Sequence, residues 1–204
     1  MNKIYGGLLK LLKDELIKLI QASPQLSLYP EEMAYLEKHD IQADTMSQHE
    51  KHSFSRFSDA YIERGDKETE EVIGVEAESF LAQPLIYLKE HMNEFIYIES
   101  KWFDLIRVDA ISLEVDDVFK TYDVLLGLKQ PKKVENLIRL FLDEQINNIE
   151  HSYELLFNQK DGVWDINITL DALKDFNENG SIGEAYAFTY QFLFRLAEAI
   201  ESGK

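Results

Sequence analysis

The spacing of apolar residues along the chain predicts helices in most places. In residues 2–22, leucines and isoleucines recur at intervals of three and four with lysines mostly between them, which is typical of an amphipathic helix. Pro30 suits the first turn of a short second helix that ends near His39. We interpret the first segment as an ordinary core helix rather than a surface anchor or partner helix, because its basic excess is only two charges.

Residues 41–65 show the weakest periodicity and are rich in Gln, Ser, Asp and His. Phe54, Phe57 and Tyr61 fit a helical stripe, whereas the run from Ser53 to Ile62 also fits an irregular strand, and the pattern leaves both alternatives open. A connection of this length without structure of its own is uncommon in a compact domain. We therefore expect a loop-rich segment at 41–65 that is either functional or conceals a further element.

Helical spacing becomes stronger after Asp66. Apolar residues share one helical face before Pro84, and they keep a period of 3.6 for about 25 residues after it. β-branched and aromatic residues between Phe95 and Val115 also fit strands, and we choose helix because the periodic run is long. Two adjacent carboxylates at 116–117 then predict the N-terminal turn of a further helix.

The clearest predicted helix begins at Pro131 and carries one unbroken apolar stripe as far as Leu156. Residues 163–168 alternate apolar and polar side chains, which fits a short strand or an extended connector, and a small helix follows from Leu170. The final helix is predicted to begin at Ser181, because Ser181 and Glu184 have the spacing of a capping box.

Together these elements predict an all-α protein. Seven or eight helices with one long loop and at most two short strands are typical of a helical bundle or an orthogonal helical array. A chain of 204 residues fits one domain, so we expect a single helical domain over residues 1–204.

The charge of the chain narrows the class of partner. The formal net charge is −17, from 38 acidic and 21 basic residues, whereas residues 1–22 have a net charge of +2, so the remainder carries about −19. Such a surface repels nucleic acid and anionic lipid and attracts cationic partners. Hydrophobic residues make up 45% of the chain, which is enough to build a core despite this charge.

The absence of cysteine excludes disulfides, thiol nucleophiles and thiolate metal sites, and it fits a reducing compartment. No apolar run of about 18 residues occurs, so we expect no membrane span. Lysines recur through the first apolar segment and no small-residue cleavage site follows it, which argues against a secretory signal. We expect a cytoplasmic protein.

One local motif is similar to a calcium loop of the EF-hand type. Asp175, Asn177, Asn179 and Gly180 occupy positions 1, 3, 5 and 6 of such a loop, but position 12 holds Tyr186 instead of the bidentate glutamate. A turn at 179–180 followed by a helix cap explains the same residues without a metal. We therefore expect calcium to bind weakly or not at all.

Histidines supply the other candidate metal ligands. His39 and Asp40 resemble the doublet of HD-type phosphohydrolases, a family that needs further His and Asp ligands on other helices, and no earlier histidine supplies the first of these. His49 and His52 are three residues apart and could share a metal on a helix, but their segment has no helical pattern. Two solvated loop histidines are the simpler interpretation.

No phosphate-binding glycine loop, dinucleotide-binding turn or nucleophile elbow occurs in the sequence. The sequence does not settle whether the protein is an enzyme, and it favours a non-enzymatic regulator, adaptor or inhibitor that needs no cofactor. We expect a protein partner with a basic surface and no nucleic acid, and homo-oligomerisation is left open. The alternative function is a metal-dependent hydrolase with ligands from residues 39–52.

The expected binding surface lies near the C-terminus. Acidic residues outnumber basic ones in the last two predicted helices, and Glu178, Glu198 and Glu201 are the positions expected to face the basic partner.

Overall fold

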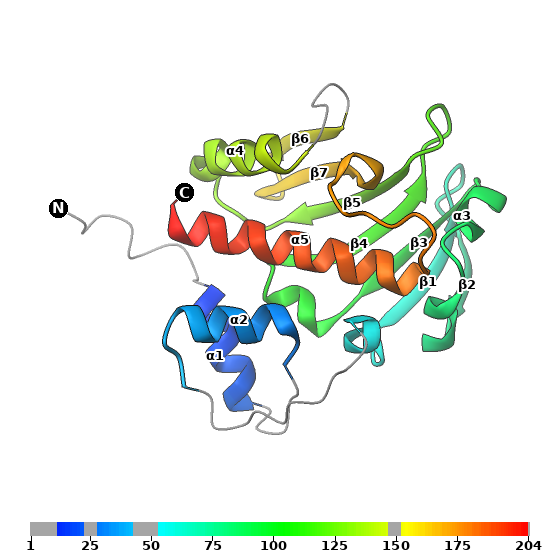
Figure 1. The fold of residues 1–204 in the computed structure, drawn as a ribbon. Helices are drawn as coiled ribbons and strands as arrows, with labels where there is room; N and C mark the ends of the chain where they lie inside the picture. Colours follow the sequence, from blue (N-terminus) through cyan, green and yellow to red (C-terminus); the bar gives the residue numbers. More distant parts are fainter. Residues whose placement is uncertain (1–11, 23–27, 43–52, 147–151, 204) are drawn as a thin grey trace.

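The computed structural model describes residues 12–22, 28–42, 53–146 and 152–203 (Figure 1). Over these residues the chain is a mixed α/β protein built on one antiparallel sheet of seven strands in the order β2-β1-β3-β4-β5-β7-β6. The prediction of an all-α bundle is therefore wrong. The strands are β1 Tyr61–Asp66, β2 Val72–Glu76, β3 Glu94–Glu99, β4 Val108–Val115, β5 Tyr122–Leu128, β6 Tyr153–Asn158 and β7 Val163–Thr169.

The helices lie on one side of this sheet. The longest helix, α5, crosses that side of the sheet, with α4 on one flank and α1 and α2 on the other (Figure 1). A short helix, α3, contacts β4, and the hydroxyl of its Tyr87 accepts a hydrogen bond from Arg64 of β1 at 3.1 Å. The helices are α1 Leu12–Ala22, α2 Pro30–Lys38, α3 Tyr87–Glu90, α4 Glu135–Gln145 and α5 Ile182–Ser202.

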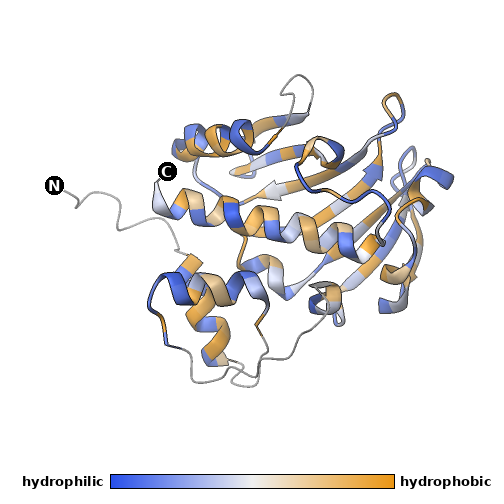
Figure 2. Cartoon of the chain, in the orientation of Figure 1, coloured by the Kyte–Doolittle hydropathy of each residue, from blue (hydrophilic) through white to orange (hydrophobic). Residues whose placement is uncertain are grey.

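The strands form because successive side chains point to opposite faces and every second one is apolar. On β4, Ile111 and Leu113 are buried while Ser112 and Glu114 are half-buried, and Figure 2 shows polar and apolar residues interleaved along the strands. The buried side chains meet the apolar side of α5 and form the core between the two layers. One face of the sheet is thus covered, and the opposite face is left open.

The predicted helix over residues 84–106 is replaced by α3, β3 and a turn of 3₁₀-helix at 101–104. The β-branched and aromatic residues noted between Phe95 and Val115 form strands β3 and β4 instead. Phe95 and Tyr97 lie on the open face of β3 and Ile96 and Ile98 on its covered face. Because both faces carry large apolar or aromatic side chains, the two-residue alternation is hidden in the sequence.

The predicted helix at Asp116 is a hairpin turn between β4 and β5. One carboxylate oxygen of Asp116 accepts hydrogen bonds from the backbone N–H groups of Val118 and Phe119 at 2.8 and 2.6 Å. These bonds hold the pKa of Asp116 below its ordinary value. A carboxylate that caps the start of a helix makes the same hydrogen bonds. The predicted bonding role of Asp116 was therefore right, but the predicted helix was wrong.

The predicted helix from Pro131 to Leu156 is divided between a helix and a strand. Helix α4 occupies its first half, and the second half contains the edge strand β6.

The segment ahead of Pro84, which was also predicted to be helical, forms β2 and a 3₁₀ turn at 78–82. Each of these segments is shorter than the periodic run that suggested a helix.

Several sequence predictions are confirmed. Helix α2 begins at Pro30, and residues 163–169 form a strand. Helix α5 begins after Ser181, whose Oγ accepts from the Glu184 N–H at 3.2 Å while the Glu184 carboxylate accepts from the Ser181 N–H at 2.7 Å.

The segment 41–65 is only partly described. Residues 43–52 lie outside the described part, Ser53–Phe57 is a 3₁₀ turn and β1 begins at Tyr61. Ile4, Leu8 and Leu11 of the first predicted helix also lie outside the described residues.

A buried ion cluster connects the helices to the rest of the protein. The Arg56 guanidinium is 4.0 Å from the ring centroid of Tyr29 and 3.9 Å from that of Tyr190, and it donates to Glu32 at 2.9 Å and to Glu31. The Tyr190 hydroxyl donates to the same Glu32 carboxylate at 2.7 Å. Since Arg56 and Glu32 are almost fully buried, this cluster fixes α2 against α5 and the turn at 53–57.

Candidate functional site: the open face of the sheet

On the open face of the sheet, polar side chains from many strands come together. Strand pairing aligns these side chains in rows that run across the sheet. The central row is Glu63, Tyr97, Ser112, Leu125, Asn167 and Glu154. We call all side chains on this side of the seven strands the open face.

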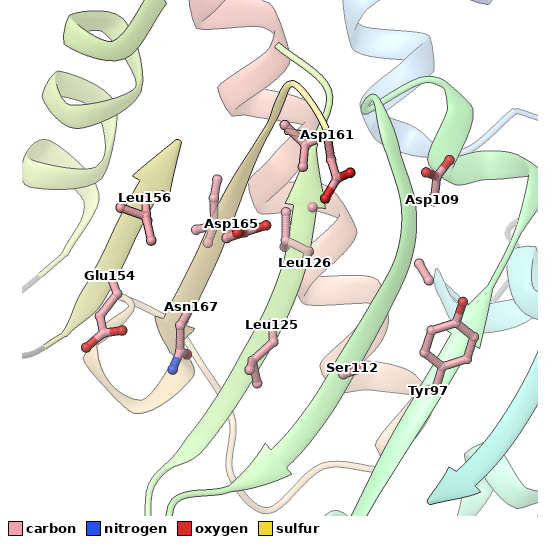
Figure 3. A pocket seen from close by; sticks show the side chains of 14 residues that line it. Tyr97, Asp109, Ser112, Leu125, Leu126, Glu154, Leu156, Asp161, Asp165 and Asn167 are labelled. Carbon is pink, nitrogen blue, oxygen red and sulfur yellow. The ribbon is translucent and has the colours of Figure 1, made fainter. Parts of the chain in front are cut away.

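The open face is hollowed over several strands. A shallow hollow of about 670 Å³ lies over strands β3 to β7 and their connections (Figure 3). Figure 3 shows side chains from each of these strands standing on this surface, with the ribbon of α5 behind the sheet. Its floor contains the Leu125 side chain, and carboxylates stand around it at Asp109, Glu154, Asp161 and Asp165.

The open face is acidic. The strand positions that face this side include seven carboxylates and no Lys, Arg or His. The carboxylates are Glu63, Glu99, Asp109, Glu114, Asp123, Glu154 and Asp165. Cations occur at its margins, where Lys129 pairs with Asp109 and Lys67 pairs with Asp117 at 2.7 Å. Glu154 and Asp165 have no ion pair with any described residue.

Two tyrosines on the open face donate hydrogen bonds to carboxylates. The Tyr97 hydroxyl donates to Glu99 at 2.7 Å, and Tyr61 donates to Glu63. Burial and the acceptor carboxylate raise the pKa of Tyr97, and the hydrogen bond to Glu63 raises the pKa of Tyr61. Both hydroxyls therefore remain protonated donors in the physiological range, and their rings stay available as apolar contact surface.

The most crowded carboxylates are Glu114 and Asp123, which are direct cross-strand partners on β4 and β5. Burial raises the pKa of both groups, and nearby carboxylates add to the effect, while Lys67 opposes it at Glu114. Asp123 also accepts a hydrogen bond from the Thr121 hydroxyl at 3.2 Å. This pair concentrates negative charge at one end of the open face.

Apolar side chains are interspersed among the carboxylates. Val75, Leu125 and Leu156 point to the open side and are 63%, 37% and 69% exposed. Phe95 lies flat across Gly65, where an added Cβ would stand 2.1 Å from the phenyl ring. Exposed apolar groups among charges of one sign are a pattern found at protein-binding surfaces.

The polar groups of the open face include carboxylates, tyrosines, Ser112 and Asn167. Its strand positions carry no His, Cys or Lys. Across the described part of the chain, no group of three or more His, Cys, Asp or Glu side chains is placed to hold a metal ion. Its carboxylates can attract cations, and its exposed apolar side chains offer area that can be buried.

The residues expected to face the partner, Glu178, Glu198 and Glu201, are held by contacts within the chain. Glu198 pairs with Lys38 at 2.6 Å and lies 3.6 Å from the His39 ring nitrogen Nε2, and Glu201 accepts from the Tyr35 hydroxyl at 2.5 Å. Glu178 precedes the opposite end of α5 and pairs with Lys89 at 3.4 Å. The structure thus does not bring the three together, and two of them connect α5 to α2.

The candidate metal ligands at 39–52 are only partly described. His39 is half-buried at the end of α2, its ring 4.3 Å from that of Tyr35, and Asp40 is exposed with a positive φ of 52°. His49 and His52 lie outside the described residues. Glu198 lies beside His39, but among the described residues His39, Asp40 and Glu198 do not form a group placed to hold a metal ion.

The segment similar to a calcium loop forms an exposed turn. Asp175, Asn177 and Asn179 are exposed, and the Asn179 N–H donates to the Asn177 side chain at 3.2 Å. Tyr186, at the position where the motif requires glutamate, is fully buried and donates to the Ile96 carbonyl at 2.6 Å. Tyr186 therefore points into the core and away from the turn.

Sequence reasoning missed the open face because its members lie on seven strands separated by up to a hundred residues. The only local sign of this surface was the alternation at 163–168, which placed Asp165 and Asn167 on one side of a strand.

No protein-family model, curated protein or solved structure matches the chain. No helix in the described residues is long and apolar enough to cross a membrane.

Proposed function

We propose that the protein binds a cationic protein partner through the open face of its sheet. The observation that carries this proposal is the composition of that face, where carboxylates from six strands surround exposed apolar side chains and no strand contributes a cation. Carboxylates attract a basic surface and orient it, and the apolar groups between them provide area that can be desolvated on contact.

The distribution of ion pairs supports the open face over the helical side. On the helical side, Glu198 and Glu201 already have donors within the chain, whereas Glu154 and Asp165 have none among the described residues. An unpaired carboxylate gains more from an incoming cation, because no internal pair must be broken first.

A second copy of the chain is a poor occupant of the open face. Two copies of this surface would oppose carboxylates with carboxylates, and like charges in an interface disfavour the complex. The partner that fits best is one whose contact surface is rich in Lys and Arg.

The test compares two charge-matched double variants. Glu154→Lys/Asp165→Lys changes the open face, and Glu37→Lys/Glu144→Lys makes the same change of net charge at exposed positions near the ends of α2 and α4. Each protein is used as bait for cellular proteins, and the association rate of any captured basic protein is measured at low and physiological salt.

We expect the open-face variant to slow association by about tenfold or more at low salt, while the control variant keeps nearly the wild-type rate. Equal losses in both variants would show that net charge alone attracts the partner. Capture of acidic proteins or nucleic acid, or an association rate that ignores salt, would contradict the proposal.

A further inference from the structure

The two edges of the sheet differ in how their backbones are protected. At the β6 edge, the Arg139 guanidinium of α4 donates to the Leu155 carbonyl at 3.4 Å, and the Tyr153 hydroxyl donates to Asp143 of the same helix at 2.7 Å. At the β2 edge, pairing is with β1 alone, and no described residue outside β1 forms a hydrogen bond with the backbone of 72–76. Strand β2 therefore presents an open row of donors and acceptors.

Three side chains on β2 are apolar and exposed. Val72, Ile73 and Val75 are 56%, 44% and 63% exposed, and none of the strand's residues is a lysine or a proline that would obstruct pairing. The register shifts once, between Arg64 and Gly65 of β1, so one residue of β2 is left unpaired. An exposed edge strand of this composition is a template for a further strand.

The charge around β2 selects among possible strands. Residues 68–78 contain five glutamates and no basic residue, and only Glu76 has an ion pair, with Arg64 at 2.7 Å. Antiparallel pairing of two copies through β2 would bring the glutamates before one strand against those after the other. Like charges opposite one another are destabilising, so self-pairing is disfavoured and a cationic strand is favoured.

The edge is also continuous with the open face. Val75 pairs with Glu63, and Glu63 pairs with Tyr97 in the central row. An added strand beside β2 would extend this row by one position, so that its side chains on that side adjoin the acidic surface.

We infer that β2 binds an extended cationic segment of a protein by strand addition, with basic side chains near the flanking glutamates and apolar side chains beside Val72 and Val75. This inference deepens the proposed function, since it rests on the same cationic partner and adds a second contact of defined geometry. Backbone hydrogen bonds supply affinity in this mode, and the side chains supply specificity.

The probe is the peptide acetyl-Lys-Val-Lys-Val-Lys-Val-Lys-amide, added to the full chain and followed by calorimetry and by NMR hydrogen exchange of the amides of 72–76. Because alternate N–H groups of a strand point the same way, two N-methylated peptides are used, one methylated at the valines and one at the interior lysines. The peptide with glutamate in place of lysine controls for charge.

We expect binding of the lysine peptide to slow exchange at β2, one N-methylated peptide to lose binding and the other to keep it, and the glutamate peptide not to bind. The variant Glu71→Lys/Glu78→Lys should weaken binding by about tenfold, whereas Glu37→Lys/Glu144→Lys should change it little. Absent binding, or equal effects of the two N-methylated peptides, would overturn strand addition.

The two proposals fail in different ways. Suppose that the peptide changes the NMR chemical shifts of Tyr97 and Leu125 but does not slow amide exchange at β2. This result would overturn strand addition and leave the open face as the site that binds the cationic partner. Protection at β2, together with a partner whose association rate is unchanged by Glu154→Lys/Asp165→Lys, would overturn the open face and retain the edge.

Discussion

The two faces of the sheet use the same strands for opposite purposes. On β5, Leu126 lies on the covered face and is 7% exposed, whereas its neighbour Leu125 lies on the open face and is 37% exposed. On the covered face, apolar residues from every strand except β2 join one core, and the buried Arg56 and Glu32 are paired. On the open face, carboxylates are crowded together with few partners. The comparison indicates that the covered face provides stability and that the open face sacrifices some stability to hold charge.

The largest effect is expected from the buried ion cluster on the covered side. Glu32→Leu removes one partner of Arg56 and the acceptor of the Tyr190 hydroxyl, leaving an arginine that is 2% exposed with less compensation. We expect the free energy of unfolding to fall by about 3–5 kcal/mol in urea denaturation.

The control for this change is Glu37→Ala, at an exposed position of the same helix, which should cost less than about 0.5 kcal/mol. The double variant Arg56→Met/Glu32→Leu should recover part of the loss, because no buried charge is then left alone. A loss below about 1 kcal/mol for Glu32→Leu would mean that the cluster does not fix α2 to the protein.

The two faces can be compared directly through adjacent leucines. Leu126→Ala removes a buried side chain and leaves a cavity, so it should lower the free energy of unfolding by about 2–5 kcal/mol. Leu125→Ala truncates a partly exposed side chain on the same strand and should cost less than about 1 kcal/mol. Similar losses in chemical denaturation would show that the open face is covered in solution.

A smaller loss is expected where the open face is closely packed. Gly65→Ala would place a Cβ 2.1 Å from the Phe95 ring and force that ring to move, at a cost of about 1–3 kcal/mol. Gly127→Ala is the matched control, since its Cβ would meet nothing closer than Val163 at 3.9 Å. Thermal unfolding of both variants measures the difference, and equal melting temperatures would show that Phe95 does not rest on Gly65.

The smallest effect, and one of opposite sign, is expected at the crowded carboxylates. The pKa of Glu114 is raised by burial, so between the ordinary carboxyl pKa and the raised value the folded state binds more protons than the unfolded chain. Its contribution to the free energy of unfolding therefore falls as pH rises through this window. Glu114→Gln should remove that dependence and raise stability near neutral pH by about 0.2–1 kcal/mol.

The control is Glu154→Gln, whose cross-strand neighbour Asn167 is neutral. It should change the free energy of unfolding at neutral pH by less than about 0.5 kcal/mol. A loss of stability in Glu114→Gln at neutral pH would mean that Lys67 outweighs both burial and the neighbouring carboxylates at this site.

The sequence alone was sufficient where a local interaction determines the structure by itself. The reciprocal bonds of Ser181 and Glu184 fix the start of α5, and the proline at position 30 fixes that of α2. The excess of acidic residues is also a property of composition, and it predicted the class of partner that we still propose. None of these conclusions needs a contact between distant segments.

Tertiary structure decided the elements whose local chemistry fits two structures equally well. A carboxylate at Asp116 that accepts from N–H groups two and three residues ahead caps a helix or closes a hairpin, and pairing of β4 and β5 with their neighbours selected the hairpin. Tyr153 and Leu156 share a helical stripe but fall on opposite faces of β6. The open face itself exists only because strand pairing brings Glu63, Tyr97 and Asp165 to one side of the sheet. Local spacing specifies which residues alternate, whereas long-range hydrogen bonding between strands decides which alternating residues meet.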